Sequence, residues 1–294
     1  MISKNAILET EDLQIGKNVV IGDNVEIRSP EKIHIGDNSV LTKDIKINCT
    51  SFEAGEYLFM CERVEIGRGG CYGPNSRVKI GKHVGIFEGT VINPSEEVEI
   101  GDDTGIGGDV MIWTHGAWLD VLQGFPADFG PVKIGSNVWL PARSIVLPNV
   151  TIGNDVVIGI NSIINRGLPN GCFAAGSPCK VIKENVYPKE LSQDEKTNII
   201  DDIIKDWLKL CEFKKITRSI KVRYEKSKFH LESGKIFLNQ SHYETIYDIE
   251  ERTIEGHIND VSEDLRDYLR RRGIKIYTDK HFKSIPVKFT YGEE

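Results

Sequence analysis

The stretch Pro131–Gly167 reads PVKIGSNVWLPARSIVLPNVTIGNDVVIGINSIINRG and decides the fold. One aliphatic residue returns every six positions, at Ile134, Leu140, Val146, Ile152, Ile158 and Ile164. An α-helix repeats near 3.6 residues and a strand near 2, so a strict repeat of six fits neither. A short fixed repeat is typical of a solenoid, in which each aliphatic side chain points inward and stacks on its equivalent in the next coil.

The same unit recurs through most of the N-terminal half. Its bulky positions are Ile15, Ile21, Ile27, Ile35, Leu41, Ile47, Met60, Ile66, Tyr72, Ile80, Ile86, Ile92, Ile100, Ile106 and Ile112. The glycine that often follows suits a corner where a side chain would be crowded. Three such sides close one triangular coil. We therefore predict a mainly β chain whose first part is a left-handed parallel β-helix of about seven coils.

The repeat is interrupted five times, always at the same junction between two sides of the triangle. The longer steps are Ile27–Ile35, Ile47–Met60, Tyr72–Ile80, Ile92–Ile100 and Ile112–Ile134. Insertions gathered on one edge of a repeat protein usually line its binding face, although they also accumulate at a tolerant corner. The longest insertion, residues 113–130, leaves from this edge.

The composition changes after the repeat. Residues 171–185 read as a final turn and an exit arm, after which glycine is rare and charged residues are dense. We expect a β-helix domain over residues 1–186 and a smaller α/β domain over residues 187–294. Ser192 and Glu195 have the spacing of a capping box at the start of an amphipathic helix. A second helix is expected over 262–272, with strands over 216–224, 228–231, 235–238, 274–278 and 285–289.

Composition bounds the class of protein. The 294 residues carry a net charge of −7, which argues against a nucleic-acid partner. No apolar run approaches the ~18 residues that span a membrane, and the N-terminus lacks the apolar core of a signal peptide. The six cysteines have no CxxC spacing and are interpreted as reduced thiols. These features predict a cytoplasmic protein without a membrane partner.

His115 is the only histidine of the longest insertion, which begins IWTHGAWLD. Imidazole titrates near neutral pH, so it can take a proton from a hydroxyl or an amine and return it. Trp113 and Trp118 lie on either side of it. They could shield a site from water or stack on a sugar, or they could simply anchor the loop. A lone histidine is also commonly structural.

The ordered motifs resemble the hexapeptide-repeat acyltransferases, especially the maltose and galactoside O-acetyltransferases and the nucleotide-sugar N-acyltransferases. The resemblance covers about residues 10–185 and comprises the repeat, the histidine on its loop, PVKIGSNVWL and AAGSPCKVIK. It implies a homotrimer whose active site lies between neighbouring prisms and whose acyl donor is a coenzyme A thioester, with acetyl-CoA or a longer acyl-CoA as co-substrate.

The resemblance also implies roles for single residues. His115 matches the general base and Trp139 the tryptophan beside the pantetheine arm. Ala142 and Ile160 match positions whose backbone groups bind that arm. Residues near the adenosine end would be Asn165, Arg166, Lys180 and Lys183. The sequence departs from the family at WLPARS, where Pro141 and Arg143 replace small residues.

The acceptor is expected to be a small sugar or nucleotide-sugar. Because simple O-acetyltransferases lack the additional C-terminal domain, we predict acyl transfer to an amino group of a nucleotide-linked sugar, as in polysaccharide biosynthesis. Sugar O-acetylation is the alternative. Four residues near the long loop could touch the acceptor: Glu88, Asn93, Asp109 and Trp113.

Two other classes share this kind of solenoid. A γ-carbonic anhydrase needs three histidine ligands. Here only His83 and His115 lie on nearby coils, with Asp120 in the loop, so no metal site is predicted. A non-catalytic scaffold remains the alternative, because solenoids offer extended interaction surfaces.

Overall fold

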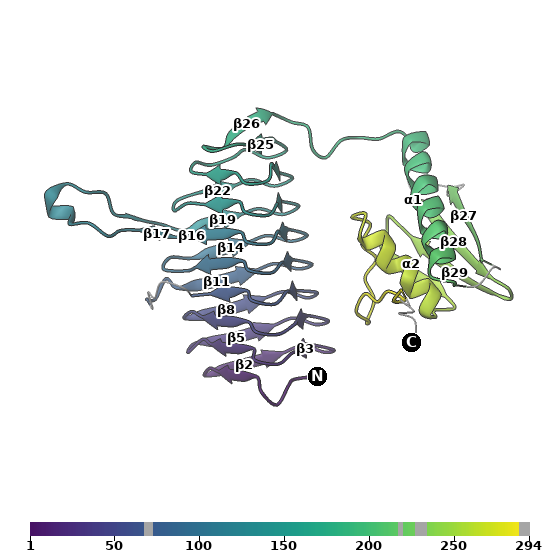
Figure 1. Cartoon of the computed structure of the whole chain (residues 1–294), viewed down its shortest axis with the longest axis horizontal. Helices are drawn as coiled ribbons and strands as arrows, with labels where there is room; N and C mark the ends of the chain where they lie inside the picture. Colours follow the sequence, from purple (N-terminus) through teal and green to yellow (C-terminus); the bar gives the residue numbers. More distant parts are fainter. Residues whose placement is uncertain (68–72, 217–219, 227–233, 288–294) are drawn as a thin grey trace, which may run out of the picture. The chain divides into compact units, whose positions relative to one another are not determined.

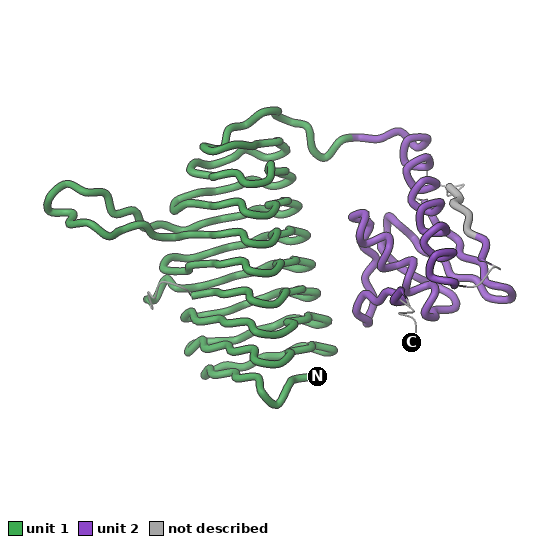
Figure 2. The backbone as a smooth tube through the Cα atoms, in the orientation of Figure 1, with its two compact units in different colours: residues 1–189 green, residues 190–294 purple. Residues whose placement is uncertain are grey.

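The computed structural model describes residues 1–67, 73–216, 220–226 and 234–287. The chain divides into two compact units, Met1–Lys189 and Glu190–Glu294 (Figure 2). The expected boundary lay between residues 186 and 187.

Three parallel sheets form the first unit, and each coil adds one short strand to each sheet (Figure 1). Face I contains β1 (Ile7–Glu9), β4 (Glu26–Arg28), β7 (Lys46–Asn48), β10 (Glu65–Ile66), β13 (Val91–Asn93), β16 (Met111–Trp113), β21 (Ile145–Val146) and β24 (Ile163–Ile164). Face II contains β2 (Asp12–Ile15), β5 (Lys32–Ile35), β8 (Ser51–Ala54), β11 (Arg77–Ile80), β14 (Val98–Ile100), β19 (Val132–Ile134) and β22 (Thr151–Ile152). Face III contains β3 (Val20–Ile21), β6 (Val40–Leu41), β9 (Phe59–Met60), β12 (Gly85–Ile86), β15 (Gly105–Ile106), β20 (Trp139–Leu140), β23 (Val157–Ile158), β25 (Phe173–Ala175) and the antiparallel β26 (Lys180–Lys183).

The predicted aliphatic stack is the core of this unit. On face II, Ile100, Ile134 and Ile152 are in register on neighbouring strands, and each is almost fully buried. Burying one such side chain contributes about 1.5–3 kcal/mol, and every coil repeats the gain. The corner glycines permit this stacking: a Cβ on Gly101 would lie 2.6 Å from the carbonyl carbon of Gly135. The predicted β-helix is confirmed.

One coil differs from the prediction. Ala54 takes the inward position of face II next to Met60 and Ile66, whereas the sequence pattern began this coil at Met60. Tyr72, expected as its third member, lies outside the described residues. The pattern missed Ala54 because a methyl group does not stand out as a bulky aliphatic position. The steps longer than six still all fall between face I and face II.

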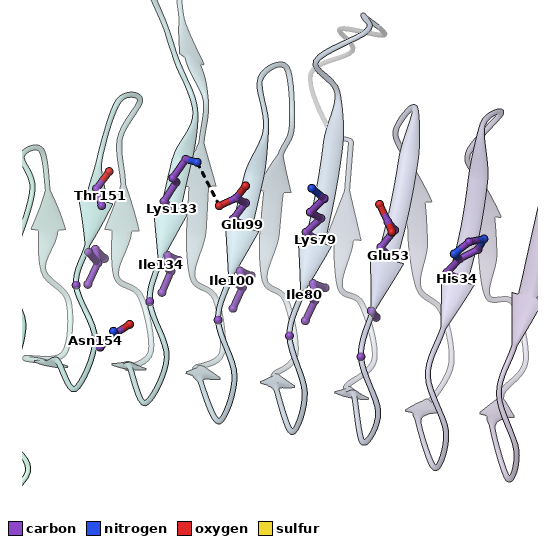
Figure 3. A pocket seen from close by; sticks show the side chains of 17 residues that line it. His34, Glu53, Lys79, Ile80, Glu99, Ile100, Lys133, Ile134, Thr151 and Asn154 are labelled. Carbon is purple, nitrogen blue, oxygen red and sulfur yellow. Dashed lines mark ion pairs between the residues drawn. The ribbon is translucent and has the colours of Figure 1, made fainter.

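The outward side chains differ between faces. Face III presents a column without charged or polar side chains, formed by Val20, Val40, Phe59, Gly85, Gly105, Trp139, Val157 and Phe173. Face II presents a polar row beside a shallow groove (Figure 3), formed by Gln14, His34, Glu53, Lys79, Glu99, Lys133 and Thr151. Charges in this row pair within the face, as between Lys133 and Glu99 at 3.2 Å.

The longest insertion forms an arm that projects from the edge between faces I and II (Figure 1). Its base is a hairpin of β17 (His115–Gly116) and β18 (Asp128–Phe129), and its tip contains the 3₁₀ turn η1 (Val121–Gln123). Trp118 and Leu122 are more than nine-tenths exposed. An apolar tip of this kind is typical of a segment that packs against another surface.

In its described residues, the second unit combines two helices with an antiparallel sheet. The helices are α1 (Gln193–Phe213) and α2 (Asp260–Arg270), and the strands are β27 (Ile220–Lys226), β28 (Gly234–Gln240), β29 (Tyr243–Asp248) and β30 (Thr253–Gly256). The capping box of Ser192 and Glu195 is confirmed. Residues 228–231 lie outside the described part of the chain. No described helix is both long and apolar enough to cross a membrane.

The strand expected over 274–278 does not form. The guanidinium of Arg266 is fully buried and instead donates hydrogen bonds to the carbonyls of Ile276, Lys280 and His281. These backbone groups are satisfied by a side chain of α2 and need no neighbouring strand. The described part of the strand expected over 285–289 is also irregular.

Candidate functional site

His115 is the first residue of β17 at the base of the arm, separated from β16 by Thr114 alone, and its side chain is partly buried. Its ring stacks on Phe129, with centroids 5.6 Å apart, and meets Trp113 edge-on at 6.1 Å. The hairpin register places His115 opposite Phe129, so the strand pairing itself holds the two rings together. Contacts from two aromatic rings restrict the orientation of the imidazole.

A hydrogen-bond network fixes which nitrogen of His115 carries the proton. Its Nδ1 lies 2.8 Å from Asn93 Oδ1 and 2.9 Å from Ser95 Oγ. The backbone N–H of Ser95 also donates to the same atom of Asn93, which identifies that atom as the amide oxygen. An amide oxygen can only accept, so Nδ1 must carry the hydrogen.

The other nitrogen of His115 is therefore a lone-pair acceptor. Nε2 has no hydrogen-bond partner among the residues that the structure describes. A neutral imidazole with a fixed donor on one side and an uncommitted acceptor on the other has the geometry of a general base. Unlike a histidine paired with aspartate, this ring is held by a neutral amide.

Asn93 was predicted to contact an acceptor, but its side chain is buried. It is 1 % exposed, and its Oδ1 also accepts hydrogen bonds from the hydroxyls of Ser95 and Thr114. The chain turns back after β13 and places Ser95 over the amide, so Asn93 supports His115. Ser95, Thr114 and Phe129 were missed by the sequence analysis. The one feature of the sequence that could have pointed to them is the strand register, which places Asn93 beside Trp113 on the next coil.

Three of the predicted acyl-donor residues meet at the corner between faces III and I. Trp139 begins β20, Ala142 follows that strand, and Ile160 takes the equivalent place after β23. Trp139 is 44 % exposed and Ile160 69 % exposed. Neither the Ala142 nor the Ile160 backbone N–H has an acceptor within the described residues. The corner thus offers free amides beside an aromatic ring.

Glycine makes room for that ring. A Cβ on Gly105 would lie 2.7 Å from the indole of Trp139, a separation too short for any side chain. Glu88 and Asp109, predicted acceptor ligands, are exposed on lower coils of the same corner. Within one chain they are therefore separated from His115, which belongs to the edge between faces I and II.

The four residues predicted near the adenosine end do not form one cluster. Asn165 and Arg166 follow β24 at the edge between faces I and II, whereas Lys180 and Lys183 lie on β26 at the end of face III. All four are exposed. Within the described residues, neither lysine has an ion-pair partner.

Asp120 does not contact His115. Its carboxylate accepts a hydrogen bond from the backbone N–H of Leu122 at 2.8 Å and caps η1 at the tip of the arm. The described residues contain no cluster of three histidine, cysteine, aspartate or glutamate side chains that could hold a metal ion.

Two half-sites result from this geometry. His115 belongs to the edge between faces I and II, and the free amides belong to the corner between faces III and I. These are different edges of one triangular prism, so a single chain does not bring them together.

Residues 131–166 match the family described as bacterial transferase hexapeptide (six repeats), and residues 13–42 match the hexapeptide repeat of succinyl-transferase. Several relatives carry the name "Putative acetyltransferase", among them one from Saccharomyces cerevisiae and one from Staphylococcus aureus. The one from Saccharomyces cerevisiae is 32 % identical over 176 residues, which cover 55 % of this chain and 84 % of that protein. The one from Staphylococcus aureus is 44 % identical over 71 residues, covering 24 % of this chain and 36 % of that protein.

The chain therefore spans only about a third of the length of the staphylococcal relatives that it matches. Among solved structures, AntD, an N-acyltransferase from Bacillus cereus in complex with dTDP and 3-hydroxybutyryl-CoA, is 19 % identical with a TM-score of 0.41. That match covers 68 % of this chain and 91 % of AntD.

Proposed function

This chain belongs to the hexapeptide-repeat acetyltransferase family, and on that premise we propose that it transfers an acyl group from a coenzyme A thioester to a sugar. The observation that carries the proposal is His115, whose Nδ1 hydrogen is fixed by Asn93 and whose Nε2 is free to accept a proton. No redox or metal chemistry is needed, because acyl transfer requires only a nucleophile, a base and an oxyanion donor.

In the proposed reaction, His115 Nε2 takes the proton of the acceptor group as that group attacks the thioester carbonyl. A backbone N–H, that of Ala142, donates to the developing oxyanion. The carbon–sulfur bond then breaks, and the imidazolium returns the proton to the departing thiolate. Trp139 and Ile160 flank the uncharged arm of the donor, while Lys180 and Lys183 face its phosphates.

We propose that the enzyme is a homotrimer in which each site joins the His115 edge of one chain to the Trp139 corner of the next. The separation of the two half-sites on one prism supports this arrangement, as do the exposed apolar arm and the apolar column of face III. Mixed trimers of His115→Ala and Trp139→Ala chains should recover activity that neither variant has alone. No recovery would count against a site shared between chains.

The acceptor group that we propose is an amine of a nucleotide-linked sugar, and the base geometry also favours a hydroxyl as the second candidate. A hydroxyl attacks well only when a base removes its proton, and His115 is built for that task. Purified protein with acetyl-CoA should be offered amino sugars, their nucleotide-linked forms and the matching hydroxyl sugars. Free thiol release and the mass of the product identify the acceptor. No release with any of them would overturn acyl transfer to sugars.

A further inference from the structure

Arg143 lies at a left-handed backbone position at the corner between faces III and I. Each coil turns this corner through one left-handed residue with φ between about 54° and 70°. The described residues at these positions are Asn24, Asp44, Arg63, Gly89, Asp109, Arg143 and Asn161. Five of the seven are glycine, asparagine or aspartate, which tolerate this conformation. The two arginines adopt it at a conformational cost.

The two arginines differ in what they contact. Arg63 pairs with Glu62 at 2.8 Å, while Arg143 has neither an ion pair nor a side-chain hydrogen bond within the described residues. On earlier coils of the same corner, Asn24 donates a hydrogen bond to Asp44 at 3.0 Å. Hydrogen bonds of this kind join the left-handed residues of neighbouring coils. The exposed guanidinium of Arg143 takes no part in such a ladder.

The surroundings of Arg143 are the proposed donor-binding corner. Ala142 directly precedes it, Trp139 lies on the strand before it, and Ile160 lies one coil on. Asp109 takes the equivalent position one coil before, yet within the described residues it forms no ion pair with Arg143, and the donor arm expected at this corner is uncharged. The phosphates of the donor have their own cations in Lys180 and Lys183 on β26. The planar fork of arginine matches oxyanions.

Resting on the proposed function, we infer that Arg143 is a specificity-determining residue that binds an oxyanion carried by the acceptor. The diphosphate of a nucleotide-linked sugar provides that group. Arg143 therefore selects a phosphorylated acceptor over a neutral sugar.

Arg143→Asn tests this inference without damaging the corner, because asparagine is the native residue at the equivalent positions 24 and 161. Calorimetric titration of the full chain would use uridine diphosphate, inorganic pyrophosphate and coenzyme A as separate probes. Charged hydrogen bonds contribute about 1.5–3 kcal/mol, so both phosphate probes should bind roughly 10- to 100-fold more weakly to the variant. Coenzyme A should bind within about twofold of wild type. Arg143→Lys keeps the charge but loses the planar guanidinium. Its affinity for both phosphate probes should therefore lie between those of wild type and Arg143→Asn.

Four results would overturn the inference. They are absence of phosphate-probe binding to wild type, equal binding to wild type and Arg143→Asn, a matching loss of coenzyme A affinity, and dissociation of the oligomer in the variant. The last two would assign the guanidinium to the donor or to an interface between chains. Failure of wild type to bind coenzyme A would instead contradict the proposed acyl transfer, which the uridine diphosphate titration does not test.

Discussion

Two edges of the same prism are built in opposite ways. The edge between faces I and II carries every step longer than six residues, ends in the arm and holds His115 through side-chain hydrogen bonds. The corner between faces III and I keeps its six-residue steps without insertion and offers backbone N–H groups beside Trp139. The irregular edge thus positions the proposed base, whereas the regular corner repeats backbone amides at the ~4.8 Å strand spacing.

The largest expected effect lies at the irregular edge. His115→Ala removes the proposed base and should lower kcat by ~10²–10⁴ while the solenoid stays folded, because residue 115 lies outside the core. Stopped-flow measurement of thiol release, with circular dichroism as the folding check, provides the test. Turnover equal to wild type would assign the imidazole a structural role.

Asn93→Asp keeps the shape of the side chain, replaces its amide NH2 by an oxygen and places a negative charge behind the proposed base. A carboxylate can accept the same hydrogen bonds from His115, Ser95 and Thr114, and it favours the imidazolium form. The acid limb of the kcat/KM profile should therefore move about one to three pH units upward. Asn93→Ala is the companion variant, since it leaves the Ser95 and Thr114 donors unpaired and should lower stability by about 1–3 kcal/mol. An unshifted limb would show that His115 is not the titrating base.

The sequence predicted the residues of the corner between faces III and I better than the surroundings of His115. The buried isoleucines define the fold because inward positions obey a rigid spacing. The family resemblance pointed to Trp139, Ala142 and Ile160, and the strand register brings them to one corner. The environment of His115 could not be read this way. The turn after Asn93 sets which partner covers its amide, and spacing does not encode the path of an insertion. The irregular path of residues 274–278 likewise depends on Arg266, a single buried side chain whose hydrogen bonds take the place of a strand partner.

A smaller effect is expected at the regular corner. Gly105→Ala places a methyl group against the indole of Trp139 and must displace it, so coenzyme A affinity should fall roughly 5- to 30-fold, about 1–2 kcal/mol. Gly85→Ala is the matched control on the neighbouring strand, because its methyl group would meet only Phe87 at an ordinary 3.4 Å. Equal affinities for the two variants would remove Trp139 from the donor site.

The smallest effect belongs to face II, the side that neither half-site uses. Lys133 and Glu99 pair at 3.2 Å (Figure 3), with 48 % and 36 % of their side chains exposed. Exposed pairs contribute about 0.2–1 kcal/mol, so Lys133→Ala should change the unfolding free energy by no more than that and leave kcat unchanged. Denaturant titration and the thiol assay measure both quantities. A loss of activity would mean that the charged face also takes part in function. It would contradict the assignment of the proposed base and of donor binding to the two edges alone.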